Sequence, residues 1–227
     1  MTGFRDLLSR GKQVAFVIRK GALEFDGEVE YINDNMMQRE EIIRHIVRLS
    51  YDEPIVSTTG KASRELFEIR EANGQGHEHD FLTVGSMGHS SSIALGMALQ
   101  RPDLRVWCID GDGAALMHLG AMVVIGTQHP SNLVHIVINN GAHETVGGMP
   151  TAARGIDLTG IAKASGYGFV QLVRTYEELD QALLEARICK CLSFLEVKTA
   201  LGARADLGRP TTTAKDNKTG FMRHYAR

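Results

Sequence analysis

Short apolar runs alternate with amphipathic stretches along most of this 227-residue chain. Runs with apolar residues at successive positions are typical of strands that are buried on both faces. The predicted strands cover residues 54–58, 80–86, 105–109, 132–138, 168–173 and 193–199. Helical spacing of apolar residues predicts helices over residues 36–50, 63–71, 91–100, 115–126, 157–166 and 176–189. This alternation predicts an α/β fold, a doubly wound parallel sheet.

Four local features refine this pattern. Ser90 or Ser91 is placed to cap the helix over 91–100, and Thr175 with Glu178 forms a capping box for the helix over 176–189. The apolar segment 13–24 predicts a further strand that stands apart from the main unit and fits the sheet of another domain. After residue 203 the chain shows little periodicity and several basic residues.

Composition narrows the class of protein. The formal net charge of −2 gives no electrostatic reason to expect nucleic acid or an anionic membrane as a partner. The apolar runs are too short to span a bilayer, and the first twelve residues lack the apolar core of a signal peptide. Cys108, Cys189 and Cys191 have no CxxC spacing, so we expect neither a disulfide framework nor a zinc site. A reducing cytoplasm is the expected location.

Two polar motifs follow two successive predicted strands. Gly-Asp-Gly, centred on Asp112, follows the strand over 105–109, and Asn-Asn, ending at Asn140, follows the strand over 132–138. The carboxyl ends of parallel strands meet at one edge of a sheet, so both side chains can point to a common place. Carboxylate, amide and carbonyl oxygens suit Mg²⁺, which completes its shell with phosphate oxygens and water. Gly111 and Gly113 let the backbone approach a phosphate.

Other phosphate and nucleophile motifs fit poorly. Leu116 stands where the third glycine of a dinucleotide-binding GxGxxG would be, and the following strand ends in amides instead of an acid. No GK[ST] follows these glycines, and Gly-His-Ser-Ser-Ser at 88–92 is not GxSxG. The plain alternative is a turn with an Asx cap at Asp112 and Asn140.

Gly-Asp-Gly, 25 intervening residues and Asn-Asn together resemble the diphosphate- and magnesium-binding signature of thiamine diphosphate enzymes. The resemblance implies a PP-type domain in which Asp112, the Asn140 side chain and the Ala142 carbonyl bind Mg²⁺. It also makes Met87 the wedge that bends the cofactor and the Gly85 carbonyl its aminopyrimidine acceptor. The residues implied in cofactor binding are Gly60, Gly85, Ser86, Met87, Gly111, Gly113 and Ala114.

Longer stretches resemble phosphonopyruvate decarboxylases and the related beta chains of sulfopyruvate decarboxylase. These are TTGKASRELFE, GQGHEHDFLTVGSMGHSS, VWCIDGDGA, LVHIVINNGAHETVGG and LGRPTTTAKDNKTGFM. The resemblance divides the chain into the end of a pyrimidine-binding domain with a linker (1–33), the cofactor-binding α/β domain (34–202) and a tail (203–227). We expect the tail to close over the site as a lid.

The resemblance implies that phosphonopyruvate, a 2-keto acid, is converted to phosphonoacetaldehyde and carbon dioxide. Lys61, His89 and His143 are the candidate catalytic residues, and Arg209 and Lys215 in the tail could help to bind the phosphonate. No Glu here matches the family's activating glutamate on the pyrimidine domain. We therefore expect a separate pyrimidine-domain (alpha-type) chain to complete the site, in a dimer of heterodimers.

Three alternatives stay open at this point. Sulfopyruvate differs from phosphonopyruvate only in its anionic group, and a beta subunit of sulfopyruvate decarboxylase would have the same features. The second alternative is a non-catalytic chain that binds the cofactor and assembles with a partner. A carboligase similar to acetolactate synthase is a weaker third, because it would usually need an additional central domain.

Overall fold

The computed structural model describes residues 2–19, 21–23 and 32–226. The chain divides into two compact units, residues 1–30 and 31–227. In the first unit, α1 (Thr2–Ser9) precedes a segment without regular secondary structure, and Phe4 stacks on Phe16. The predicted strand over 13–24 is wrong for 13–19 and 21–23, and its remaining positions lie outside the described residues. An apolar run becomes a strand only where a neighbour pairs with its backbone.

The second unit is built on a parallel sheet. Its strands are β1 (Ile55–Ser57), β2 (Asp80–Leu82), β3 (Val106–Gly111), β4 (Leu133–Asn139), β7 (Phe169–Val173) and β8 (Ser193–Lys198). They pair in the order β2-β1-β3-β4-β8-β7, and every pair is parallel. A separate antiparallel pair joins β5 (Ala142–His143) to β6 (Met149–Pro150). The predicted parallel sheet is confirmed.

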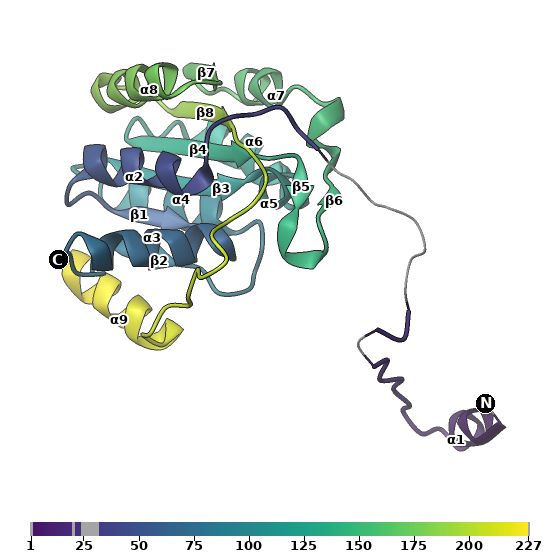
Figure 1. Ribbon diagram of the computed structural model, residues 1–227. Coiled ribbons are helices and arrows are strands. Elements are labelled where there is room, and N and C mark those ends of the chain that lie inside the picture. Colours follow the sequence, from purple (N-terminus) through teal and green to yellow (C-terminus); the bar gives the residue numbers. More distant parts are fainter. Residues whose placement is uncertain (1, 20, 24–31, 227) are drawn as a thin grey trace. The chain divides into compact units, whose positions relative to one another are not determined.

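Helices cover both faces of the sheet (Figure 1). On one face lie α2 (Arg39–Ser50), α3 (Lys61–Ala72) and α8 (Tyr176–Ile188). On the other lie α4 (Ser90–Gln100), α5 (Asp112–Met117), α6 (Gly120–Gln128) and α7 (Leu158–Ala164). Two short 3-10 helices, η1 (Glu144–Val146) and η2 (Ala152–Gly155), follow β5 and β6. The chain is therefore doubly wound, as the alternating pattern predicts.

The core is a pair of apolar layers, one on each side of the sheet. Every residue of β4 is buried, because helices cover both of its faces. On one side α2 contributes Ile42, Ile43 and Ile46, each fully buried. Burying one such side chain contributes about 1.5–3 kcal/mol. The central strands are thus held in fixed positions.

Two expectations about helices are corrected. The single helix predicted over 115–126 is two helices, because His118 leaves helical geometry (φ −128°, ψ 44°) and its ring nitrogen Nδ1 lies 3.1 Å from the Gly88 carbonyl oxygen. Neither Ser90 nor Ser91 caps α4. The N-cap is His89, without a side-chain cap hydrogen bond, and both serines are buried inside the helix.

The tail contains a helix, α9 (Ala214–Tyr225), that lies beside the edge strand β2 (Figure 1). The Asn217 side chain donates to the Asp80 carbonyl at 2.9 Å and accepts from the Leu82 amide at 3.0 Å. These bonds satisfy backbone groups that an edge strand leaves unpaired. Apolar periodicity does not reveal this helix, because its only buried side chains are Asn217 and Phe221. The role of the tail as a lid stays a prediction.

Cys189 and Cys191 form a disulfide, which corrects the expectation of no disulfide. The two residues flank a turn between α8 and β8 that brings their Cα atoms to 5.3 Å, within the usual range for this bond. Within the described part of the chain, no helix is long and apolar enough to cross a membrane.

The capping box of α8 gives the first testable prediction. Thr175 accepts from the Glu178 amide at 3.2 Å, and the Glu178 carboxylate accepts from the Thr175 amide, as the sequence predicts. Thr175→Ala leaves the helix's first N–H groups without this acceptor, so we expect the free energy of unfolding to fall by about 1 kcal/mol. Chemical denaturation measures it. Thr127→Ala, in the exposed face of α6, is the control and should change stability by less than about 0.5 kcal/mol.

Candidate functional site

The pocket lies where the strand order changes direction, between the carboxyl ends of β1 and β3. The chain leaves β1 into α3 on one face and leaves β3 into α5 on the opposite face. The two connections diverge, and such a switch point opens a crevice at the sheet edge. The pocket is lined by Arg39, Thr58, Thr59, Lys61, Ala62, Met87, Asp110, Gly111, Asp112, Gly113, Ala114, Ile138, Asn140, Ala142, His143, Glu144 and Thr145.

Strand register brings the two polar motifs together. Gly111 pairs with Ile138 at the end of the β3–β4 ladder, so Asp112 and Asn140 leave neighbouring strands at the same edge. Both side chains are buried and both residues line the pocket. The Asn140 side-chain oxygen accepts from the Ala142 amide at 2.9 Å. The turn that follows β4 is therefore fixed by Asn140 itself.

Asp112 is a buried carboxylate at the first turn of α5. The Thr151 hydroxyl donates to it. Burial raises the pKa of Asp112 above its ordinary value, although the Thr151 hydroxyl and the Gly113 amide oppose this effect by hydrogen bonding. A buried anion of this kind is stabilised by a cation. With the Asn140 amide and the Ala142 carbonyl, it makes an all-oxygen donor set that fits Mg²⁺.

Gly113 lets two side chains approach the backbone at the start of α5 closely. A Cβ atom there would lie 2.5 Å from His143 Cε1, 2.9 Å from His143 Nδ1 and 3.2 Å from Met87 Cε. Met87 and His143 thus close on the backbone at the start of α5. Only glycine permits this contact without moving a neighbour.

A charged cluster that the sequence analysis missed borders the pocket. Arg39 binds both carboxylate oxygens of Glu65 at 2.7 and 2.8 Å and one oxygen of Glu144 at 2.7 Å. Lys61 Nζ lies 3.4 Å from the same Glu144 oxygen. Arg39 lies on the face of α2 that also carries three buried isoleucines. A charged residue on this apolar face was the sign by which the sequence could have revealed the cluster.

Glu144 is held as an anion. Burial would raise its pKa, but hydrogen bonds from Arg39 and the Gly202 amide, with the charges of Arg39 and Lys61, lower it below the ordinary value. Burial and the bonds from Arg39 act in opposite directions on Glu65 as well, where burial dominates and the pKa is raised. Arg39 therefore links two acids, and Lys61 is the more exposed cation of the cluster.

Most of the predicted site residues meet at this pocket. It is lined by Lys61, Met87, Gly111, Asp112, Gly113, Ala114, Asn140, Ala142 and His143. It is not lined by Gly60, Gly85, Ser86, His89, Arg209 or Lys215. Gly85 and Ser86 have positive φ in the loop before α4, and the His89 ring lies 4.8 Å from that of His118. The chemical role of each residue stays a prediction.

A second group of potential ligands shares Asp110 with the pocket lining. Cys108, Asp110 and His135 are fully buried, and their ligand atoms lie within 4.8 Å of one another. His135 Nε2 is 3.4 Å from Asp110 Oδ2, and His135 Nδ1 is 3.1 Å from the Tyr167 hydroxyl. The Tyr167 contact gives His135 a partner inside the protein, so this group is satisfied without a metal.

Comparison with known proteins identifies the family. The family described as "Thiamine pyrophosphate enzyme, C-terminal TPP binding domain" matches residues 58–197, more than half of the chain. The chain belongs to this family. The matched region contains the pocket motifs around Asp112 and Asn140.

Two groups of relatives are similar to this chain. A phosphonopyruvate decarboxylase of Streptomyces viridochromogenes is 36% identical over 170 residues, which are 75% of this chain and 41% of the relative. A sulfopyruvate decarboxylase subunit beta of Methanocaldococcus jannaschii is 36% identical over 160 residues, 68% of this chain and 81% of the subunit. The chain thus spans less than half of the first relative and most of the second.

A solved structure agrees on the fold. The benzoylformate decarboxylase of Polynucleobacter necessarius superposes with a TM-score of 0.62 at 18% identity, covering 73% of this chain and 33% of that one. At this identity the likeness concerns the fold alone. It confirms the predicted PP-type α/β domain.

The packing around Gly113 is directly testable. Gly113→Ala puts a methyl group against the ends of the His143 and Met87 side chains, which can move aside, so we expect a loss of no more than about 1 kcal/mol in the free energy of unfolding. Gly120→Ala is the matched control, since a Cβ there meets no atom within 4 Å. That variant should be neutral or more stable by up to about 1 kcal/mol. Equal losses in urea denaturation of both variants would contradict the assigned packing.

Proposed function

We propose that this chain supplies the diphosphate- and metal-binding half of a thiamine diphosphate-dependent 2-keto acid decarboxylase that acts on phosphonopyruvate. The observation that carries the proposal is the convergence of Asp112, Asn140 and Ala142 on one buried pocket in a thiamine pyrophosphate-binding domain. The relatives, which are phosphonopyruvate and sulfopyruvate decarboxylases, support the reaction class.

Asp112, the Asn140 side chain and the Ala142 carbonyl would hold Mg²⁺, and the metal would hold the cofactor's diphosphate. Gly111, Gly113 and Ala114 would place backbone against the phosphate oxygens, and Met87, which lies beside Gly113, would support the cofactor. When bound, thiamine diphosphate supplies the electron sink for loss of carbon dioxide. The residues of this chain would bind and orient the cofactor and balance the charge of its diphosphate.

Lys61 is the residue best placed to receive the substrate's anionic group. Arg39 is committed to Glu65 and Glu144 through short bonds, whereas Lys61 approaches Glu144 at 3.4 Å and has three N–H donors. A phosphonate dianion gains more from such a cation than a sulfonate monoanion does. His143 lies against Gly113 and could hold a proton near the reacting centre.

A separate pyrimidine-domain chain would complete the site and assemble with this one as a dimer of heterodimers. The relatives support this arrangement, because one group consists of beta subunits and the other matches over only part of its length. The cytoplasm is the proposed location. Sulfopyruvate is the alternative substrate, favoured by the high coverage of the beta subunits.

A substitution at Asp112 tests cofactor binding by a measurement that does not depend on enzymatic activity. Because its pKa is raised in the fold, its charge destabilises the metal-free fold as pH rises above the unfolded-state value of about 3.9. At pH 7, Asp112→Asn should therefore raise the melting temperature of the metal-free protein. It should also abolish the stabilisation by Mg²⁺ and thiamine diphosphate, which amounts to about 2.7 kcal/mol at 100 times the Kd.

Thermal unfolding with and without both ligands measures these effects. Asp206→Asn, at an exposed position, is the control and should behave as the wild type. A full ligand-induced shift in Asp112→Asn would contradict the metal site.

Carbon dioxide release tests the reaction and the substrate. The chain, co-expressed with a pyrimidine-domain chain, is assayed on phosphonopyruvate and on sulfopyruvate. We expect activity only with the partner and a preference for phosphonopyruvate. Lys61→Ala should raise KM for phosphonopyruvate by about 10- to 150-fold, because a hydrogen bond to a charged group contributes about 1.5–3 kcal/mol. Lys218→Ala, exposed on α9, should leave KM unchanged.

The other outcomes distinguish the alternatives. A preference for sulfopyruvate would keep the reaction and replace the substrate. Cofactor binding without turnover on either acid, in the presence of the partner, would favour a non-catalytic assembly subunit.

A further inference from the structure

The disulfide between Cys189 and Cys191 lies just before β8, at the amino-terminal edge of the parallel sheet, whereas the pocket lies at the carboxyl ends of the strands. Cys189 caps the end of α8, and Cys191 stands just before β8. Both cysteines are half-buried, and Lys190 between them is exposed. The pair therefore lies at the protein surface, where small thiols can approach it, and such access is the first requirement for exchange.

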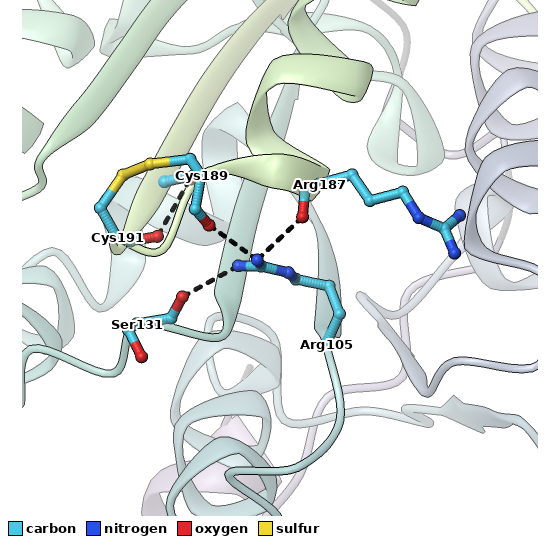
Figure 2. The surroundings of a disulfide bond; sticks show 6 residues. Arg105, Ser131, Arg187, Cys189 and Cys191 are labelled. Atoms are coloured by element: carbon cyan, nitrogen blue, oxygen red, sulfur yellow. Dashed lines mark hydrogen bonds between the residues drawn. A yellow bond between two sulfur atoms is a disulfide. The ribbon is translucent and has the colours of Figure 1, made fainter.

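The backbone at Cys189 is held by contacts that do not involve sulfur. Figure 2 shows the Arg105 guanidinium donating to three carbonyl oxygens, those of Ser131 at 2.9 Å, Arg187 at 2.9 Å and Cys189 at 2.7 Å. The Cys189 amide also donates to the Glu185 carbonyl at 2.8 Å. One cation thus joins the start of β4 to the end of α8.

Cys191 is fixed independently. The Ser193 hydroxyl donates to the Cys191 carbonyl at 3.2 Å, and Ser193 itself pairs with Val134 of β4 and Phe169 of β7. A Cβ at Gly168 would lie 3.3 Å from the Cys191 Cβ, so the neighbouring backbone packs directly on this side chain. The two Cα atoms should remain near their 5.3 Å separation when the sulfur–sulfur bond is open.

This bond is poorly suited to be a structural staple. A disulfide stabilises a fold mainly by closing a loop in the unfolded chain, and the effect grows with loop length. Here the residues are only two apart, so the closed loop is minimal. The folded state, in contrast, keeps both sulfur atoms within reach of each other. A bond that is readily formed, accessible and of little use for stability has the properties of an exchanging pair.

We propose that Cys189 and Cys191 are a redox-active dithiol that exchanges with low-molecular-weight thiols of the glutathione class. A thiolate of the small molecule attacks one sulfur of the bond, forms a mixed disulfide with it and releases the other cysteine as a thiolate, which takes up a proton. A second small thiolate then attacks the sulfur of the bound small molecule, forms a disulfide with it and releases the remaining cysteine as a thiolate, which takes up a proton. Two small thiols are oxidised to one disulfide, and the cysteine pair is reduced to two thiols.

Nearby positive charge favours the departing thiolate. Lys190 lies between the cysteines in sequence, and the Arg105 guanidinium binds the Cys189 carbonyl. Cations beside a cysteine stabilise its ionised form. The third cysteine, Cys108, is free but fully buried, so it serves as an internal control that a small thiol cannot reach.

The protein is equilibrated in buffers that contain reduced and oxidised glutathione at varied ratios. Free thiols are then alkylated without unfolding the protein, and the mass of the intact protein is measured by mass spectrometry. Under reducing conditions we expect two cysteines, Cys189 and Cys191, to be alkylated, and after reoxidation neither of them. Cys108 should remain unlabelled in both states. The melting temperature should change by no more than a few degrees between the two states. Two thiols that persist in excess oxidised glutathione would overturn the proposal. A bond that opens only when the protein unfolds would also overturn it.

Variants test the mechanism of exchange. In Cys189→Ser or Cys191→Ser, at least one remaining cysteine should take up a single glutathione, and the absence of an adduct on both would overturn the proposal. Arg105→Gln should slow ring closure after reduction about tenfold, because the guanidinium no longer orients the Cys189 backbone. Arg101→Gln, which removes a surface arginine paired with Asp103, is the matched control and should reoxidise at the wild-type rate. If Arg105→Gln does not fold, the glutathione titration of the wild-type protein still tests the proposal.

Discussion

The parallel pairing of β3 with β4 is the constraint on which the site depends. Six consecutive residue pairs, from Val106–Leu133 to Gly111–Ile138, fix where the two strands end. Asp112 and Asn140 come directly after those ends, so a shift of the ladder by one residue would separate them and turn every core side chain to the wrong face. Two apolar layers hold this register. The core thus determines the geometry of the donor atoms.

Charge at the sheet edge is balanced in two different ways. Arg39 joins Glu65 and Glu144 in a buried cluster, so each of these two carboxylates has a cationic partner. Asp112 receives hydrogen bonds from Thr151 and the Gly113 amide and forms no salt bridge with the described residues, and burial raises its pKa although the nearby His143 charge opposes this effect. A protein that retains such a carboxylate gives up stability at the position where it binds a ligand. The contrast separates the structural part of the pocket from the part that we propose binds metal.

Sequence was sufficient for the features that rest on local patterns. Apolar runs located the six parallel strands, Thr175 and Glu178 formed the expected capping box, and the spacing of Asp112 and Asn140 located the pocket. Features that depend on partners distant in sequence were missed. Asn217 binds the edge of β2, and Arg39 meets Glu144 more than a hundred residues away. The segment 13–19 is apolar but has no strand beside it, and Cys189 meets Cys191 only through the shape of one turn.

The central claim is that Asp112, Asn140 and Ala142 hold the metal that anchors the cofactor's diphosphate. A crystal structure of the protein soaked with Mn²⁺ and thiamine diphosphate, with anomalous differences recorded for manganese, tests it most directly. We expect one manganese peak, at about 2.0–2.3 Å from an Asp112 carboxylate oxygen, the Asn140 amide oxygen and the Ala142 carbonyl oxygen. A peak among Cys108, Asp110 and His135 instead, or cofactor density without metal at Asp112, would contradict it.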